Sequence, residues 1–472
     1  MKRKHSILCL IILLFSVGIA RGETVSTSTA EDQVGMQVTV YNSNIGLVKD
    51  TRKIVLPRGT GELRFMDVAA RIRPATVDVK STTDPKSFAV LEQNYEYDLM
   101  NSKKLLDKYV GKKIKIIDVN KYQDRKDVIE ATLLSNNQGR IFKINDEIYL
   151  GHPGYKVLPK IPENLIAKPT LTWLCRNDLK KPQIVQVSYL TRSINWKADY
   201  VVVLDGKDVR ADVSGWVTLD NKSGATYKNA DLKLVAGDVH VAEESRLRYA
   251  VSKARAPVAD ADDFKAKAFF EYHIYTLQRK TTVKDKQTKQ VRLITASGAK
   301  VEKELLVYGI RSFFTRLYRD RNPKQPVNVY VKFKNSKDNN LGMPLPAGVM
   351  RLYKQDQDGS RQFIGEDKID HTPKDEEVKL KIGKAFDVVA ERRQTDYKRM
   401  TSRLHESAWE ITLRNHKDQE VAVGIVEPLY GHWKVIEKNH PFKKMDAFTI
   451  RFDVKVPKNG EVKVKYRVRV GF

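Results

Sequence analysis

Apolar and polar side chains alternate along most of this chain, and the alternation is clearest between Val187 and Val241. A two-residue period places one face of a β-strand against a core and the other face in water. Short polar segments with glycine or asparagine separate the apolar runs, and these residues favour tight turns. The pattern predicts several antiparallel strands joined by hairpins, with apolar positions at Val187, Tyr189, Tyr200, Val202, Leu204, Val209, Ala211, Val213, Trp216, Leu219, Leu232, Leu234 and Ala236.

Three large aromatic residues, Trp196, Tyr200 and Trp216, lie within this stretch. Aromatic side chains bury wide apolar surfaces, so a place in the core is the expected role for all three. If two of the rings were exposed on one face, they would instead form a stacking platform for a sugar ring or a peptide. The three residues are therefore candidate binding residues, and their burial decides between the two interpretations.

The N-terminus has the pattern of a secretory signal peptide over residues 1–22. Lys2, Arg3 and Lys4 precede an apolar run over Ile7–Ala20, and that run is too short to cross a bilayer comfortably. Small residues follow it at the expected cleavage position. The sequence thus predicts an exported protein of the cell envelope, periplasmic or extracellular, with no membrane span after cleavage.

Cleavage would lower the formal net charge from +27 to +23 and would leave Cys175 as the one cysteine. A single cysteine forms no intramolecular disulfide, and Cys175 is expected to be a buried small apolar side chain. The expected partner is an unknown envelope protein, or an anionic envelope glycan or lipid, and we expect no nucleic acid. For the charge itself we favour a lysine-rich solvated surface over a polyanion-binding role, since lysines on outward strand faces also prevent strand edges from pairing.

Two further motifs lie in the alternating stretch, N-W-x-A-x-Y at Asn195–Tyr200 and G-W-V-x-L-x-N-x-S-G at Gly215–Gly224. A-G-D follows at Ala236–Asp238, and related segments lie at Tyr41–Arg52 and Phe270–Leu277. Together these motifs resemble the bacterial domain-of-unknown-function family 4139, uncharacterised extracytoplasmic proteins that include mucoidy-inhibitor-like members. The resemblance covers most of the chain after the signal peptide. It implies a β-rich envelope protein and transfers no catalytic residues.

Breaks in the alternation suggest the domain organisation. The fold class that we predict is mostly β, with tandem antiparallel β-sandwich domains, a small SH3-like β insertion and a few short helices. After a disordered lead-in at 23–33, we predict an N-terminal β-domain at 34–165, with a short helix at Leu99–Lys108 and a barrel-like unit at about 109–150. A central β-meander domain follows at 166–300, with a mobile loop at 242–267. The last segment is a C-terminal immunoglobulin-like β-sandwich at 301–472, whose seven strands include Val349–Tyr353.

Motifs for catalysis or cofactor binding are missing from the sequence. It has no G-x-S-x-G elbow, no phosphate-binding loop, no dinucleotide fingerprint and no H-E-x-x-H pair, so we expect no cofactor and no metal. The acidic run Asp260–Asp263 lacks the glycine and the spaced glutamate of a calcium loop. Glu271, His273 and Tyr275 would share one strand face, and a Glu–His pair is able to act as a general base. A hydrogen-bonded structural histidine is the ordinary alternative.

These observations favour an exported envelope protein that acts without catalysis, as a binding or assembly factor. One alternative is an envelope hydrolase of glycans or peptides, whose acidic residues would come together only in the fold. The other is a surface protein that binds polyanions or polysaccharides.

Overall fold

The computed structural model describes residues 25–98, 100–120, 125–162, 165–237, 239, 264–269, 272–318 and 323–471. Strands account for 63% of the structure and helices for 4%, so the predicted mostly-β fold with several antiparallel sheets is confirmed. The predicted signal peptide lies outside the described residues, as does the predicted mobile loop up to residue 263.

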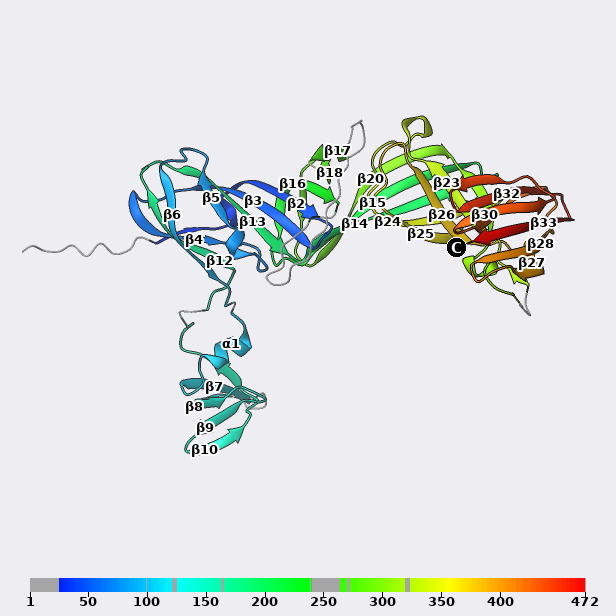
Figure 1. The fold of residues 1–472 in the computed structure, drawn as a ribbon. Coiled ribbons are helices and arrows are strands. Elements are labelled where there is room, and N and C mark those ends of the chain that lie inside the picture. The colour runs from blue at the N-terminus through cyan, green and yellow to red at the C-terminus, as the bar shows by residue number, and fades with distance from the viewer. Residues whose placement is uncertain are drawn as a thin grey trace, which may run out of the picture. The chain divides into compact units, whose positions relative to one another are not determined.

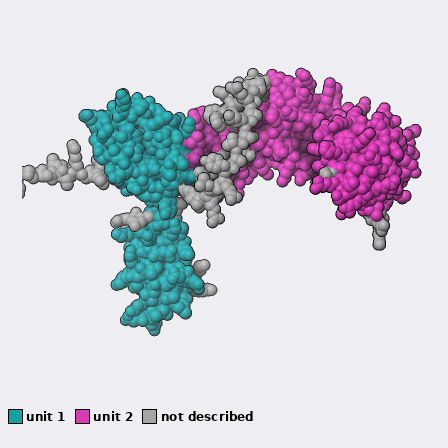
Figure 2. Space-filling view, in the orientation of Figure 1, with its two compact units in different colours: residues 1–36, 49–189 teal, residues 37–48, 190–472 magenta. Residues whose placement is uncertain are grey.

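The chain divides into two compact units. Unit 1 comprises Met1–Met36 and Lys49–Tyr189, and unit 2 comprises Gln37–Val48 and Leu190–Phe472 (Figure 2). The division falls within three long strands, β2 (Gln33–Tyr41), β3 (Ile45–Ile54) and β13 (Gln183–Arg192). The other elements of unit 1 are β1 (Val25–Ser28), β4 (Gly59–Met66), β5 (Asp78–Ser81), β6 (Phe88–Glu96), α1 (Ser102–Asp107), β7 (Lys113–Asn120), β8 (Arg125–Ser135), β9 (Ile141–Ile144), β10 (Glu147–Leu150), β11 (Tyr155–Val157) and β12 (Thr170–Asn177) (Figure 1).

The main sheet of unit 1 has the strand order β1-β4-β12-β6. Its alternating positions bury Leu63, Phe65, Leu171 and Trp173 completely, and the rings of Phe65 and Trp173 lie 5.4 Å apart. The period of two continues along β4, as the alternation predicts, whereas β12 is buried on both faces from Thr170 to Trp173.

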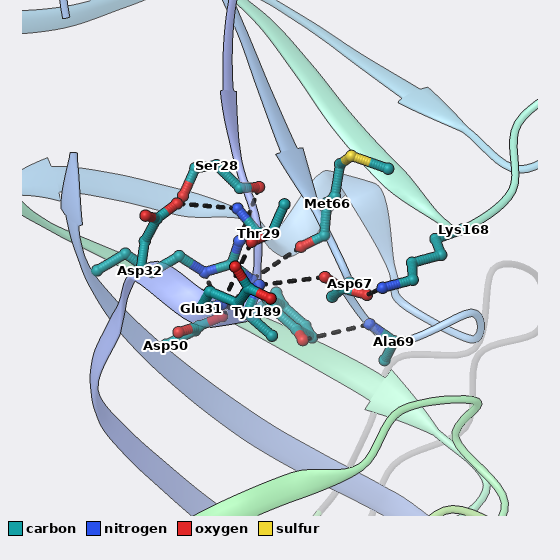
Figure 3. A network of polar contacts seen from close by, with 12 residues as sticks. Ser28, Thr29, Glu31, Asp32, Asp50, Met66, Asp67, Ala69, Lys168 and Tyr189 are labelled. Carbon is teal, nitrogen blue, oxygen red and sulfur yellow. Dashed lines mark hydrogen bonds and ion pairs between the residues drawn. The ribbon is translucent and has the colours of Figure 1, made fainter. Parts of the chain in front are cut away.

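Strand β1 corrects the expectation of a disordered lead-in at 23–33. It pairs in parallel with β4 and ends at Ser28, which is labelled in Figure 3. The buried guanidinium of Arg52 fixes this end, because its Nη1 donates to the carbonyl of Ser28 at 3.0 Å. Arg52 Nη2 also donates to the carbonyl of Met66 at 2.8 Å and to Asp50 Oδ2 at 2.7 Å, and the guanidinium lies 3.5 Å from the centre of the Phe65 ring. The polar composition of the lead-in gave the wrong prediction because an edge strand needs few apolar side chains when distant groups satisfy its backbone.

A small β unit forms within unit 1 from α1 and β7–β11. Its strand order is β10-β9-β8-β7-β11, a meander whose fifth strand returns beside the first. It is the predicted small insertion, although it continues past residue 150 to Val157. The predicted helix is shorter than expected and starts after Asn101, whose side chain accepts from the backbone N–H of Lys104 at 2.9 Å. The unit has its own core of Leu106, Tyr109, Ile114, Ile116, Ala131, Leu133, Phe142 and Ile144.

Unit 2 holds most of the strands. They are β14 (Ile194–Leu204), β15 (Arg210–Asn221), β16 (Tyr227–Ala236), β17 (Phe264–Phe269), β18 (Tyr272–Leu277), β19 (Thr281–Val283), β20 (Gln287–Lys300), β21 (Glu302–Tyr308), β22 (Lys324–Gln325), β23 (Asn328–Lys334), β24 (Gly348–Gln355), β25 (Arg361–Ile369), β26 (Glu377–Lys384), β27 (Val388–Arg399), β28 (Leu404–Asn415), β29 (Val421–Pro428), β30 (His432–Lys438), β31 (Lys443–Asp446), β32 (Thr449–Val456) and β33 (Gly460–Gly471).

The central region is not the continuous meander that the alternation suggested. Strands β14 and β15 do pair as a hairpin, but β16 leaves them and joins β18 and β2 in another sheet. Strand β24, expected in the C-terminal sandwich, pairs in parallel with β14 instead, from Ala198 opposite Gly348 onward. Alternation gives the faces of a strand but does not encode its neighbour, so these pairings were not predictable from period alone.

The C-terminal sandwich packs a six-stranded sheet, β26-β23-β21-β29-β32-β31, against a five-stranded sheet, β22-β27-β28-β33-β30 (Figure 1). Both sheets contribute to one core that includes Val307, Val423, Phe452, Trp409, Ile411, Val464 and Tyr466. Alternate residues of β28 and β33 point away from this core. The outer face of the five-stranded sheet is therefore free to carry polar side chains.

Candidate functional site

Three of the candidate aromatic residues come together in the core of unit 2. Trp196 is 3% exposed, and its ring meets that of Tyr275 edge-on with centres 6.1 Å apart. The hydroxyls of Tyr200 and Tyr275 donate to the carbonyls of Pro346 and Pro344 at 2.8 and 3.0 Å. These rings hold a buried loop against the sheets, so they are core residues and leave no free stacking face.

Trp216 and His273, the other candidates that the structure describes, lie on strands of different sheets. Trp216 is half-buried on β15, with the guanidinium of Arg292 5.6 Å from its ring. His273 is half-buried on β18, and burial together with the positive charge of His371 lowers its pKa. Glu271 lies outside the described residues, so the Glu–His pair remains a prediction.

Cys175 is a buried free cysteine, as predicted. Burial raises the pKa of its thiol to about 11, so the thiol stays protonated at neutral pH. A protonated thiol is a poor nucleophile, and Cys175 therefore acts as a small apolar side chain in the sheet.

A depression of about 420 Å³ lies on the outer face of the five-stranded sheet of the C-terminal sandwich. Its floor is Ala408 on β28, which lies opposite Asp396 of β27 on one side and Arg467 of β33 on the other. The methyl group of Ala408 is shorter than the side chains of Asp396 and Arg467 on either side of it, which leaves a hollow. Bulges in β27 between Gln394 and Asp396, and in β30, disrupt the ladders beside it.

Ion pairs form the walls of this charged depression. Arg467 Nη1 lies 2.8 Å from Asp396 Oδ2 and 3.2 Å from Glu406 Oε1, and its Nε lies 3.7 Å from Glu437 Oε2. On the next cross-strand pair, the ammonium of Lys465 lies 3.0 Å from Glu410 Oε2. Each carboxylate of the walls therefore has a cationic partner.

The edge of the depression is fixed by Asn439, just beyond β30. Its Nδ2 donates to the carbonyl of Lys463 at 2.8 Å, and its Oδ1 accepts from the backbone N–H of Lys465 at 2.7 Å. The ammonium of Lys438 lies 4.4 Å from the ring of Phe442. The residues that line the depression thus include three cations, Lys438, Lys465 and Arg467, and two anions, Glu410 and Glu437. Asp396 and Glu406, which also pair with Arg467, lie beside this lining, so the charges around the depression are close to balanced.

Three carboxylates of this face, Glu410, Glu406 and Asp396, titrate below their usual range. A hydrogen bond from Lys465 lowers the pKa of Glu410, one from Arg469 lowers that of Glu406, and one from Arg467 lowers that of Asp396. A general acid needs a pKa raised toward neutrality. These groups are instead ionised at neutral pH, and their arrangement suits the recognition of a polar or charged ligand.

Acid is expected to destabilise the C-terminal sandwich through these groups. A carboxylate with a lowered pKa in the folded state contributes stability above its ordinary pKa and loses it as the pH falls through the folded value. The midpoint of thermal unfolding should therefore fall as the pH drops from about 5 to about 3. Arg467→Gln should flatten this dependence, whereas Lys455→Gln, an exposed lysine on β32, should leave it unchanged. An equal slope in Arg467→Gln and the unchanged chain would contradict this account.

No pattern in the sequence indicated this depression. Its lining comes from four strands, and Glu410 and Lys465 are neighbours only because β28 and β33 pair with that register. The alternation of apolar and charged residues in β33 did indicate a charged outer face. The acidic partners on β27, β28 and β30 could not be assigned to it, since pairing across strands is set by the tertiary fold.

Among the described residues, no cluster of three or more histidine, cysteine, aspartate or glutamate side chains could hold a metal ion. The acidic run Asp260–Asp263 lies outside them. Within the same part of the chain, none of the helices combines the length and apolar character required to cross a bilayer.

No family model matches the chain, and no curated protein matches it. The resemblance to the domain-of-unknown-function family 4139 therefore rests on the sequence motifs alone and stays a prediction. In the structure, Trp196 and Tyr200 of the first motif are core residues, which accounts for that motif by packing rather than by chemistry.

Proposed function

We propose that this chain is an exported, non-catalytic binding protein of the bacterial cell envelope, and that the charged depression of its C-terminal sandwich binds an anionic glycan. The observation that carries the proposal is the lining of that depression, where cationic side chains that donate hydrogen bonds lie beside carboxylates that accept them. Sugar hydroxyl groups both donate and accept hydrogen bonds, and a uronate or phosphate on the glycan would pair with Lys438, whose ammonium lies against the ring of Phe442.

The envelope location is supported by the predicted signal peptide and by the net positive charge of the chain after cleavage. The hydrolase alternative needs a carboxyl group that remains protonated near neutral pH. The pKa values of Glu410, Glu406 and Asp396 are lowered instead, which supports binding rather than hydrolysis.

Binding to a polyuronate such as alginate tests the proposal. Lys465→Gln with Lys438→Gln should weaken binding about thirtyfold, because each of the two cations contributes roughly 1 kcal/mol near a polyanion at low salt. The affinity of the unchanged protein should also fall as salt is raised from about 50 to about 500 mM. Isothermal titration calorimetry with defined alginate oligosaccharides measures both effects.

Lys455→Gln is the matched control, since Lys455 is an exposed lysine on β32, in the opposite sheet of the sandwich. It removes the same charge and should leave the affinity nearly unchanged. If all of the variants bind alginate equally, or if neutral dextran binds as tightly as alginate, the depression does not bind an anionic glycan.

A further inference from the structure

The outer face of the small β unit carries a row of exposed apolar side chains. Tyr155 of β11 lies opposite Ile117 of β7, and Ile117 lies opposite Val128 of β8. Tyr155 is 73% exposed and Val128 is 60% exposed. Directly opposed residues in a sheet lie about 5 Å apart, so these three side chains form one continuous apolar strip.

A second apolar group lies at the β10 edge of the same face. Ile148 and Leu150 of β10 pair with Lys143 and Ile141 of β9, whose side chains point away from the core. Ile148 is 66% exposed and Leu150 is 86% exposed. The core of the unit lies on the opposite face, so packing within the unit does not account for these exposed side chains.

Lysines separate the two apolar groups. Lys113, Lys115, Lys126 and Lys143 all share the outward register of this face, and Glu130 is the one acidic residue that alternates with them on β8. Glu130 lies 3.9 Å from Lys113, and Lys143 lies 2.7 Å from the exposed turn residue Asp146. Such exposed pairs are weak, so the face keeps a positive potential.

The shape of this face favours a fluid surface as its partner. Tight protein interfaces are anchored by side chains that fill pockets. Here Val128, Ile148, Leu150 and Tyr155 are each at least 60% exposed, so their apolar side chains protrude from the sheet. Protruding apolar groups interspersed with lysines are typical of segments that lie in a bilayer interface, where the apolar parts enter the acyl boundary and the ammonium groups meet anionic headgroups.

We propose that the outer face of the small β unit docks on an anionic lipid surface, with Val128, Ile148, Leu150 and Tyr155 entering the interface and the four lysines contacting headgroups. A second copy of this chain is disfavoured as occupant because two basic faces repel each other. This docking is separate from glycan binding, since it uses none of the residues of the charged depression.

Co-sedimentation with lipid vesicles tests the docking. Residues 23–472 are used, so that the apolar run Ile7–Ala20 contributes nothing. The chain should bind vesicles of equal parts phosphatidylglycerol and phosphatidylcholine, and should bind vesicles of phosphatidylcholine alone at least about tenfold more weakly. Leu150→Ser with Tyr155→Ser should weaken binding to the anionic vesicles about tenfold or more. Lys115→Gln should weaken it about fivefold.

Phe386→Ser is the matched control, because Phe386 is a 94% exposed apolar residue of unit 2. It should bind like the unchanged chain, as should Lys465→Gln, which separates this result from the fate of the glycan proposal. All of the substituted side chains are exposed, and equal thermal unfolding curves verify that the variants fold. Absence of vesicle binding, or binding that Leu150→Ser with Tyr155→Ser leaves intact, would overturn the proposal. Binding of soluble polyglutamate in place of vesicles would overturn it in favour of an acidic polypeptide.

Discussion

Glu427→Ala is expected to lower the free energy of unfolding of the C-terminal sandwich by about 3–5 kcal/mol. Glu427 and Arg392 are 0% and 1% exposed, and Arg392 Nη1 lies 2.7 Å from Glu427 Oε1. The pair joins β29 of one sheet to β27 of the other through the middle of the core. Loss of the carboxylate would leave a buried guanidinium without its counter-charge.

The remaining contacts of Arg392 cannot replace Glu427. Its Nη1 lies 3.2 Å from the hydroxyl of Tyr466, its Nε donates to Gln325 Oε1 at 2.8 Å, and its guanidinium lies 4.9 Å from the centre of the Phe313 ring. These neighbours are neutral. They orient the guanidinium, whereas the carboxylate balances its charge, so the cost of the substitution is mainly electrostatic.

Denaturant unfolding followed by tryptophan fluorescence measures this effect, since Trp409 lies in the same core. The double variant Arg392→Met with Glu427→Leu is the control. It removes both charges at similar volume and should recover most of the lost stability, because a buried ion pair adds little over well-packed apolar side chains. A loss below about 1 kcal/mol in Glu427→Ala would show that water reaches the pair.

A comparable loss, about 3–5 kcal/mol, is expected for Arg52→Met in unit 1. The substitution leaves the Asp50 carboxylate buried without a cation and deprives the carbonyls of Ser28 and Met66 of their donor (Figure 3). Strand β1 would then lose the hydrogen bond from Arg52 that holds its last residue, Ser28. The measurable results are a lower unfolding midpoint of unit 1 and faster proteolysis near Ser28.

The pH dependence of that loss identifies its cause. Burial already raises the pKa of Asp50, and Arg52 opposes that rise. Without Arg52 the folded-state pKa rises further above the unfolded value, so the variant loses stability as the pH increases through that range and regains it in acid. Arg64→Met is the control, because Arg64 and Glu62 form an exposed pair at 2.7 Å that contributes little. A defect of equal size at about pH 4 and about pH 7 would contradict the electrostatic explanation.

The sequence predicted the faces of the strands better than their partners. The alternation in Ile194–Leu204 correctly placed Trp196 and Tyr200 on a buried face, because one strand needs only its own period to show which side is apolar. It did not predict that β24 would lie beside β14. That choice depends on packing between segments about 150 residues apart, and many alternating strands satisfy the same pattern.

The charged depression was beyond prediction for a related reason. Lys465 and Arg467 look like ordinary solvent-facing residues in the sequence, and their importance comes from Glu410, Glu406 and Asp396 on adjacent strands. The buried pair of Arg392 and Glu427 was equally hidden, since each residue alone suggests an exposed position. The two-residue period of a strand does not indicate which charged residue of another strand its own charged residues will pair with.

The parallel pairing of β14 with β24 has a kinetic consequence. Ala198 and Gly348 become neighbours only after about 150 intervening residues are brought into a closed loop, and β21 with β29 requires a further closure from Leu305 to Val423. Closing such long loops lowers the entropy of the chain before the contacts between the strands form and stabilise the fold. Because folding slows as contact order rises, we expect refolding on a timescale of milliseconds to seconds or slower. During that interval the long apolar strands stay exposed to solvent and available to chaperones.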